Sequence, residues 1–329
     1  MNKSLQSLIL KSTHATSLFK IETIQSLWNG YGEIVRYGLE GADQQSVILK
    51  HIRLPAQNHH PRGWNTDLSH QRKVKSYQIE VAWYKQWSQM CSTQCYTPHC
   101  FATKHKQDEI FIVLEDLNTS GFPVLKTQVS DKEIKACLSW LAHFHATFMN
   151  KQANDLWPIG TYWHLDTRPD ELRALQDIDL KGVASQIDQK LQNCTFKSFV
   201  HGDAKLANFC FSQDGKNVAA VDFQYVGGGC GMKDVAYFIG SCLNEQQCQQ
   251  QETSLLDYYF QQLKLALEKY QTDIDSHAVE QEWRALYPIA WTDFHRFIKG
   301  WSPDHWKINS YSEQLAREVI FKLNHPGNQ

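Results

Sequence analysis

The sequence has little of what a secreted, disulfide-linked or membrane-spanning chain needs. Its nine cysteines are an odd number without the spacing of a paired framework, which is typical of proteins in a reducing compartment. The apolar run at residues 8–10 is too short for a signal-peptide core, and no stretch approaches the apolar length of a membrane span. We therefore expect a cytoplasmic protein with no membrane partner.

An excess of either charge is also lacking. Lys and Arg number 33 against 35 Asp and Glu, which gives a net charge of −2. A chain with this balance has no overall basic field to hold nucleic acid or an anionic bilayer. We expect no nucleic-acid partner, and any polyanionic ligand must meet a local group of positive charges. Nothing in the sequence indicates the oligomeric state.

The 329 residues, 42% of them hydrophobic, suffice for two ordinary domains, each with its own core. The first part predicts mixed sheet. Two β-rich runs, at residues 28–37 and 46–52, flank a turn-like segment and should form a hairpin, while residues 109–114 predict a further strand. Residues 69–90 lack Gly and Pro and carry apolar side chains at helical spacing, which predicts a helix.

A cluster of breaking residues at 118–121 places the domain boundary after the last of these strands. The fold class is therefore α+β, with a small β-rich domain at 1–116 and a larger, mainly helical domain at 117–329. Ser130 and Glu133 form the pattern of a capping box ahead of an amphipathic run. Further helices are predicted at residues 255–270, 279–297 (with a break near Pro288) and 312–323.

One β-rich island, at residues 198–224, interrupts the helical part. Two short apolar strands flank Asp214 and Gly215, a strong hairpin signal. Folding the hairpin about Gly215 places Asn208 and Asp222 at equal distances from its tip. Opposed residues in an antiparallel pair have Cβ atoms roughly 4.5–5.5 Å apart, so the two side chains can share one cation if they point the same way.

A carboxylate with an amide oxygen suits Mg²⁺, which keeps several positions for water and phosphate oxygens. Few His or Cys ligands lie nearby to suggest zinc. Asp203 precedes Asn208 by five residues in a glycine-containing turn, where a carboxylate can reach the same space without ligating the metal. These residues predict a magnesium site at Asn208 and Asp222, with Asp203 as a general base.

The motif HGDAKLAN at residues 201–208, followed by Asp-Phe-Gln at 222–224, resembles the catalytic loop and metal-binding motif of the aminoglycoside phosphotransferase and choline kinase group. The Asp-Phe-Gln form and the tryptophan-rich tail look most like the ecdysteroid kinase-like branch of that group. The resemblance spans about residues 25–240 in motif order. It implies a two-lobed protein-kinase-like fold, with an ATP-binding N-lobe at 1–116 and a catalytic and acceptor-binding lobe at 117–329.

The resemblance also implies residue roles. Asp203 would accept the proton of the acceptor hydroxyl, and Lys205 would contact the transferring phosphoryl group. Asn208 and Asp222 would hold Mg²⁺ on the phosphates of ATP. Lys50, oriented by Glu80, would bind the α- and β-phosphates. Gly30 and Gly32, which fall short of a full G-x-G-x-x-G, would form the phosphate-covering loop. The backbone at Leu114 and Asp116 would bind adenine, and Asp234 would brace the catalytic loop.

These roles describe an ATP- and Mg²⁺-dependent phosphotransferase that acts on a hydroxyl of a small molecule. Choline or ethanolamine, an aminoglycoside, a sterol-like alcohol, a sugar and a nucleoside all stay open as acceptors, since a fold does not define the second substrate. The alternative is a catalytically inactive kinase-like protein that binds nucleotide and regulates a partner. The presence of Asp203 argues against it, because binding alone needs no base.

Two further patterns have alternative interpretations. Trp291, Trp301 and Trp306, with Asp293 among them, form either an aromatic and acidic wall for a cationic acceptor or part of the core. The glycine run at 227–231 has the wrong spacing for a dinucleotide-binding turn. We expect it instead to let a loop pass close to the substrate.

Overall fold

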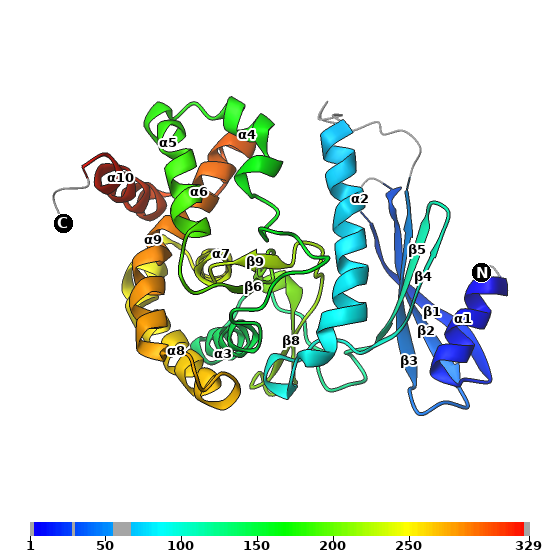
Figure 1. The fold of residues 1–329 in the computed structure, drawn as a ribbon. Helices are drawn as coiled ribbons and strands as arrows, with labels where there is room; N and C mark the ends of the chain where they lie inside the picture. The colour runs from blue at the N-terminus through cyan, green and yellow to red at the C-terminus, as the bar shows by residue number, and fades with distance from the viewer. Residues whose placement is uncertain (1–2, 28–29, 55–66, 326–329) are drawn as a thin grey trace. The chain divides into compact units, whose positions relative to one another are not determined.

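The computed structural model describes residues 3–27, 30–54 and 67–325. Contacts group this part of the chain into two compact units (Figure 1). The expected α+β class is confirmed, because one unit is built on a sheet and the other on helices. The lobe boundary after residue 116 stays a prediction. The first unit comprises Met1–Ser92, Tyr96–Leu125 and Cys210–Gln224, and the second comprises Thr93–Cys95, Lys126–Phe209 and Tyr225–Gln329.

The first unit is built on an antiparallel sheet, which among the described residues has the strand order β1-β2-β3-β5-β4. The predicted hairpin is β2–β3, with Val35 opposite Leu49. The sequence analysis did not predict strand β1, most of whose side chains are exposed. The strands are β1 (Ser17–Ser26), β2 (Gly32–Glu40), β3 (Ser46–Arg53), β4 (Cys100–Lys106) and β5 (Glu109–Glu115).

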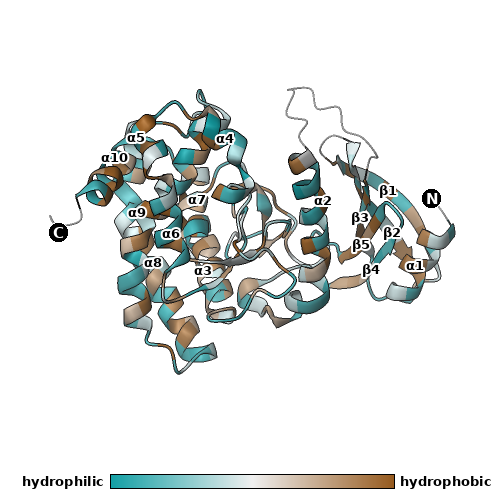
Figure 2. Cartoon of the chain, turned by 45° about the horizontal axis from the view of Figure 1, so that its top comes forward, coloured by the Kyte–Doolittle hydropathy of each residue, from teal (hydrophilic) through white to brown (hydrophobic). Residues whose placement is uncertain are grey.

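The two faces of this sheet bury different partners, because side chains alternate along a strand. Leu49 belongs to a hydrophobic cluster with Leu5 and Ile9 of α1 (Lys3–Thr13), a helix that the sequence analysis did not predict. Lys50 points to the opposite face, where its ammonium meets a carboxylate of α2 (Asp67–Ala82). Figures 1 and 2 show α1 and α2 on opposite sides of the sheet.

The helix predicted at residues 69–90 changes character along its length. Its first part is α2, and it continues as a π-helical turn at Trp83–Trp87 and a 3₁₀ turn at Ser88–Met90. Of the apolar residues that predict it, Tyr77 and Tyr84 are buried, and Val74 and Val81 are half-buried. The predicted apolar face is therefore confirmed. The π-helical turn and the 3₁₀ turn at the end of the helix are not indicated by the pattern of apolar residues.

The hairpin predicted around Gly215 is present as β7 (Phe209–Phe211) and β8 (Val218–Ala220). Its turn closes through a hydrogen bond from the backbone N–H of Ser212 to the carbonyl oxygen of Asn217, 2.9 Å. The ladder is shorter than expected, so the expectation that it pairs Asn208 with Asp222 is wrong. Asn208 ends a 3₁₀ turn before β7, and Asp222 follows β8 with a positive φ of 68°.

The second unit is mainly helical. Helix α9 contacts α4, α6, α7 and α10, and it runs without a break through Pro288. The break predicted there is wrong, because burial of the helix among these neighbours outweighs the single backbone hydrogen bond that proline removes. The helices are α3 (Asp131–Thr147), α4 (Pro169–Ala174), α5 (Ile178–Gly182), α6 (Ala184–Gln192), α7 (Met232–Cys242), α8 (Glu245–Tyr270), α9 (Ser276–Trp301) and α10 (Ser310–Asn324).

The capping box at the start of α3 is confirmed. The backbone N–H of Ser130 donates to the Glu133 carboxylate over 2.8 Å, and Lys126 pairs with the same carboxylate. Hydrogen bonds from Lys126 and from the Ser130 N–H lower the pKa of Glu133 to about 2. The helix therefore begins where its sequence indicates, with a negative charge near its N-terminal dipole.

The glycine run at residues 227–229 forms strand β9, which pairs with β6 (Ser198–Val200). A Cβ on Gly227 would lie 2.2 Å from the carbonyl oxygen of Trp157, and one on Gly228 would lie 2.8 Å from that of Pro158. The chain's own backbone at residues 157–158 therefore makes the close approach that these glycines permit. The role expected beside the substrate stays a prediction.

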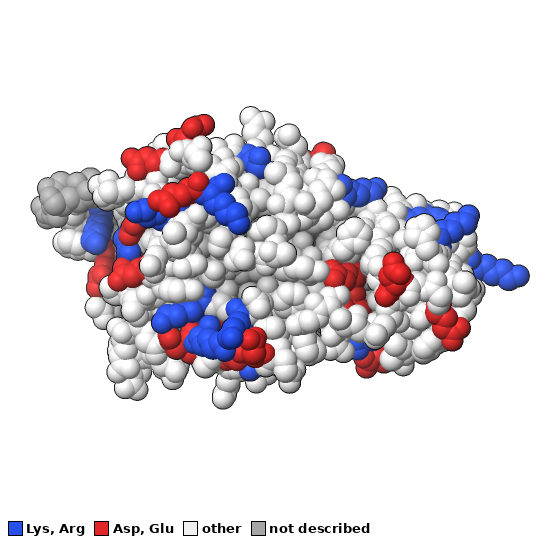
Figure 3. All heavy atoms as spheres, turned by 90° about the horizontal axis from the view of Figure 1, so that it is seen from below, with Lys and Arg blue, Asp and Glu red and all other residues white. Residues whose placement is uncertain are grey.

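The surface matches the balanced composition. Figure 2 shows hydrophobic and hydrophilic residues alternating along the helices of the second unit, as amphipathic helices require. The face drawn in Figure 3 carries basic and acidic side chains intermixed. All nine cysteines lie in the described part of the chain and are free thiols. No helix among the described residues combines the length and hydropathy needed to cross a membrane.

Replacing Gly32 with alanine is expected to destabilise the first unit. Its φ is +130°, and a Cβ there would lie 1.9 Å from the carbonyl oxygen of His51. Strain of this kind costs about 2 kcal/mol or more, which urea unfolding monitored by circular dichroism would measure. Gly182→Ala is the control, because a Cβ at Gly182 meets nothing within 4 Å. Equal stability of the two variants would contradict the steric requirement.

Candidate active site

The first group of candidate residues lies wholly within the first unit. The Nζ of Lys50 is 2.7 Å from Oε2 of Glu80 and 3.1 Å from Oδ1 of Asp222. The side chains of Lys50 and Glu80 are only 6% and 1% exposed, whereas that of Asp222 is 35% exposed. The predicted pairing of Lys50 with Glu80 is therefore present, and a predicted metal ligand joins the same ammonium.

Burial and charge act in opposite directions on this group. Burial lowers the pKa of Lys50, but attraction to Asp222 and Glu80 outweighs it, so the pKa lies above its ordinary value. Burial raises the pKa of Glu80, and Lys50 offsets only part of that rise. Lys50 thus stays charged at neutral pH. Its ammonium lies beside the carboxylate of Asp222 and provides the fixed positive charge that binding of a phosphate requires.

Each residue of the Asp-Phe-Gln segment has its own contact within the first unit. Asp222 binds Lys50, while the ring of Phe223 stacks on Trp83 at 4.5 Å between centroids. The Oε1 of Gln224 accepts hydrogen bonds from Lys73, 2.8 Å, and Ser76, 3.3 Å, both on α2. The glutamine that distinguishes this motif therefore attaches it to the helix that carries Glu80.

Asp222 adopts a left-handed backbone conformation that non-glycine residues seldom occupy. Gln224 donates to its Oδ1 over 2.5 Å, in addition to the contact from Lys50. Strained residues held by surrounding contacts are concentrated at functional sites. In this conformation the carboxylate of Asp222 points to Lys50, and the chain no longer continues the extended conformation of β8. Contrary to the expectation from the sequence, Asp222 therefore does not extend the β7–β8 ladder.

The second group lies wholly within the second unit and centres on Asp203. Its carboxylate accepts hydrogen bonds from the hydroxyl of Tyr237, 3.1 Å, from the ammonium of Lys205, 3.0 Å, and from the amide nitrogen of Asn208, 3.1 Å. Asp203 is 5% exposed, while the side chain of Lys205 is 40% exposed. The structure therefore brings together the predicted base, the predicted phosphoryl contact and one predicted metal ligand.

Asn208 is oriented by two donations. Its amide nitrogen also donates to the carbonyl oxygen of Asp203 over 2.7 Å. Because the nitrogen faces Asp203, the amide oxygen of Asn208 points the other way. The amide oxygen of Asn208 in the second unit and the carboxylate of Asp222 in the first are each hard oxygen donors of the kind that Mg²⁺ prefers, so each residue by its chemistry fits this ion.

The loop that carries Asp203 is held from beneath by Asp234. The buried carboxylate of Asp234 accepts from the backbone N–H groups of His201, 2.5 Å, and Gly202, 2.9 Å, and contacts the imidazole of His145 at 3.2 Å. Helix α7 supplies Asp234 in its first turn, and α3 supplies His145. This is the bracing position that the resemblance implies for Asp234.

The remaining positions of the predicted nucleotide site have local roles. Gly30 lies between β1 and β2 and Gly32 is the first residue of β2, where the N–H of Leu27 donates to the carbonyl of Gly32 over 2.7 Å. The expected strand began at Trp28, and that residue and Asn29 lie outside the described residues. The phosphate-covering role of the two glycines stays a prediction.

Leu114 and Asp116 stand at the end of β5. The backbone of Leu114 lies inside the sheet, between Ile48 and Cys100. The carboxylate of Asp116 accepts from Arg36 and Ser46, both at 2.7 Å, and so joins the strand end to β2 and β3. The adenine contact predicted at their backbone stays a prediction, while the Asp116 side chain serves the sheet.

The aromatic and acidic wall proposed for the C-terminal tryptophans is not formed as a unit. Asp293 is fully buried and binds Arg296, 2.8 Å, and the indole of Trp163, 3.1 Å. Trp291 is also buried in the core, whereas Trp301 and Trp306 are 40% and 60% exposed. Asp293 lies on the buried face of α9, so its carboxylate is not presented with the exposed rings of Trp301 and Trp306.

Two residues near Asp203 were missed by the sequence analysis. Tyr237 lies on α7, where the pattern reads as core, and its hydroxyl reaches the base. Lys307 lies in the segment between α9 and α10, and its charge acts on Asp203. No spacing signal identifies either residue, because packing of elements distant in sequence brings Tyr237 into contact with the base and Lys307 within range of its charge.

A model of the ecdysteroid kinase-like family matches residues 41–156 and 164–272. A microcompartment-associated aminopropanol kinase has a TM-score of 0.52 and 12% identity, covering 100% of this chain and 99% of that chain. A Streptomyces rimosus aminoglycoside phosphotransferase solved with ADP and streptomycin has a TM-score of 0.43 and 12% identity, covering 88% and 98%. None of the curated protein sequences compared matches significantly.

The sheet with Lys50 and the helical unit with Asp203 define a protein-kinase-like phosphotransferase fold, the fold shared with the aminopropanol kinase. The family match extends over more than half of the chain and includes both groups of candidate residues. The chain belongs to the ecdysteroid kinase-like family. The resemblance stated from the HGDAKLAN and Asp-Phe-Gln motifs is thereby confirmed.

Removing the charge of Lys50 is expected to destabilise the first unit strongly. Lys50→Met leaves the carboxylate of Glu80 buried without its partner, which costs about 3–5 kcal/mol. Chemical denaturation would measure this loss, and Lys50→Met combined with Glu80→Gln should recover part of it. Arg53→Met, at an exposed position of the same strand, is the control. A loss no greater than in the control would show that the pair does not support the fold.

Proposed function

We propose that this protein transfers the γ-phosphoryl group of ATP to a hydroxyl of a small-molecule acceptor in the cytoplasm. The observation that supports it most is the setting of Asp203. A buried carboxylate is held by Tyr237, Lys205 and Asn208 on a loop that Asp234 fixes. Such an arrangement suits a base that orients a hydroxyl, and a protein that only binds nucleotide does not need it.

The proposed roles divide between the two units. In the first, Lys50 would bind the α- and β-phosphates with its charge maintained by Glu80, and Asp222 would ligate Mg²⁺. The bound ion would neutralise phosphate charge during transfer. The backbone at Leu114 and Asp116 would bind adenine, and Gly30 and Gly32 would cover the phosphates. These assignments rest on the ion pair within the first unit and on family membership.

In the second unit, Asp203 would accept the proton of the attacking hydroxyl. Lys205, which is already 3.0 Å from Asp203 and partly exposed, would contact the transferring phosphoryl group. Asn208 would supply an amide oxygen to Mg²⁺, since its nitrogen is engaged with Asp203. Catalysis of this kind depends on positioning and charge neutralisation more than on covalent chemistry.

Asp203→Asn is expected to lower turnover at least 100-fold while nucleotide affinity stays within about threefold, because a base acts mainly in the transition state. ATP consumption would be measured over a panel of alcohols, and nucleotide affinity by calorimetry with Mg-ADP. Asp273→Asn, an exposed position, is the control. Near-normal turnover of the Asp203 variant would remove it from the role of base.

Asp222→Ala is expected to weaken Mg-ADP binding at least tenfold, because it removes a proposed metal ligand. Calorimetric titration with ADP, in the presence of Mg²⁺ and then of EDTA, separates the contribution of the metal from that of the nucleotide. Asp108→Ala, exposed in the turn between β4 and β5, is the control within the same unit. Unchanged affinity of the Asp222 variant for Mg-ADP would refute the metal assignment.

A further inference from the structure

Lys307 occupies a rigid position between helices α9 and α10. Its backbone N–H donates to the Nδ1 atom of His305, 3.2 Å, and its carbonyl oxygen accepts from the hydroxyl of Ser312, 3.1 Å. Ser312 also forms a capping box with Asn309 at the start of α10. The backbone of Lys307 is therefore hydrogen-bonded through both its N–H and its C=O, which sets the direction of its Cα–Cβ bond.

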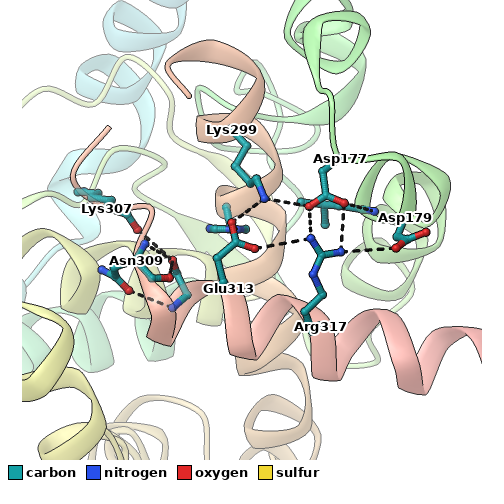
Figure 4. Close-up of polar contacts among 10 residues, drawn as sticks. Asp177, Asp179, Lys299, Lys307, Asn309, Glu313 and Arg317 are labelled. Atoms are coloured by element: carbon teal, nitrogen blue, oxygen red, sulfur yellow. Dashed lines mark hydrogen bonds and ion pairs between the residues drawn. The ribbon is translucent and has the colours of Figure 1, made fainter. Parts of the chain in front are cut away.

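The helix that follows is tied to the rest of the second unit by a network of charges (Figure 4). Lys299 of α9 donates to Asp177, 2.9 Å, and to Glu313, 2.6 Å, and Arg317 of α10 also binds Asp177. Burial raises the pKa of Asp177, but hydrogen bonds from Arg317 and Lys299 outweigh it and hold the pKa well below its usual range. Both ends of the segment that carries Lys307 are thus anchored.

The ammonium group of Lys307 lies against aromatic faces. Its Nζ is 4.5 Å from the ring centroid of Tyr237, 5.2 Å from that of Phe294 and 5.6 Å from that of Trp306. All three distances are within the range of cation–π attraction. Tyr237 and Phe294 are buried, and their ring centroids lie 4.8 Å apart, while Trp306 is 60% exposed at the edge of the group.

The same aromatic group contacts the proposed base. The hydroxyl of Tyr237 donates to Asp203, and its ring lies under the ammonium of Lys307. Burial lowers the pKa of Lys307 to about 8, against the attraction of Asp203. At neutral pH the group is still mainly protonated. A positive charge of the chain itself therefore occupies the aromatic surface whose Tyr237 hydroxyl binds Asp203.

We propose that Lys307 determines acceptor selectivity by filling this aromatic site, so that the protein accepts alcohols without a positive charge beside the reactive hydroxyl. The inference rests on the proposed function and names its substrate class, a neutral or anionic alcohol. A quaternary or primary ammonium on the acceptor would compete with Lys307 for the same ring faces and be repelled by its charge. Among the acceptors left open by the sequence, choline, ethanolamine and aminoglycosides are disfavoured.

The test compares two probes of equal shape, choline and its uncharged isostere 3,3-dimethylbutan-1-ol. Their affinities for the full chain are measured by calorimetry without nucleotide, for the wild type, Lys307→Met and Lys307→Arg. We expect the wild type and Lys307→Arg to bind the neutral probe at least tenfold more tightly than choline. In Lys307→Met, choline affinity should rise at least tenfold while affinity for the isostere changes less than threefold.

Lys264→Met removes an exposed lysine of α8 in the same unit and should leave both affinities unchanged. If Lys307→Met does not fold, as judged by circular dichroism, Lys307→Gln takes its place. The inference is overturned if the ratio of the affinity for choline to the affinity for the isostere is the same in the wild type and the variant. It is also overturned if the variant does not bind choline. Wild-type protein that binds choline as tightly as the isostere also overturns it.

Failure of this inference can be distinguished from failure of the proposed function. The affinity ratio is read without ATP, whereas the proposed function is tested by the turnover of Asp203→Asn and by Mg-ADP binding to Asp222→Ala. Unchanged selectivity in the Lys307 variant, with both of those results as expected, would reject only the acceptor class. Normal turnover of the Asp203 variant would reject the proposed base and leave the affinity ratio standing.

Discussion

Lys50 carries an ammonium group into the interior of the first unit, 2.7 Å from Glu80 and 3.1 Å from Asp222. A charge so far from water is tolerated only beside opposite charge. That requirement constrains three elements together: β3 must present Lys50 to α2, α2 must turn Glu80 inward, and the chain after β8 must bend back through the left-handed conformation of Asp222. The strain at Asp222 is stabilised by the lysine it contacts and by Gln224.

The second unit meets a comparable constraint with hydrogen bonds to its backbone. Asp234 satisfies the N–H groups of His201 and Gly202, and this fixes the loop on which Asp203 stands. The carboxylate of Asp203 then accepts three hydrogen bonds, two from residues close in sequence and one from a distant helix. Charge balance here differs from that around Lys50, because the ammonium of Lys307 lies over aromatic faces and is attracted by Asp203, with no carboxylate within ion-pair distance of it among the described residues. The two buried lysines therefore differ in surroundings, since carboxylates neighbour Lys50 and aromatic rings neighbour Lys307.

Local sequence patterns predicted a good part of this architecture. The β2–β3 hairpin, α2, the capping box of α3 and the hairpin around Gly215 follow from neighbouring residues, since alternation, helical spacing, caps and turns act within a few positions. The site residues were named from their motif order and their likeness to a family. Patterns failed at β1, whose side chains are mostly exposed, and at Pro288, where the packing of α9 outweighs a lost hydrogen bond.

The sequence by itself determined the class of fold, the order of the candidate residues and the kind of chemistry they suit, because those depend on residue type and short-range spacing. Only the tertiary structure decided which groups meet. Lys50 and Asp222 are 172 positions apart, and Tyr237 reaches Asp203 from a different helix. Lys307 reaches the same neighbourhood from the segment before α10. Such meetings depend on how buried surfaces pack and on which charges can be neutralised there, and no local pattern of residues specifies either.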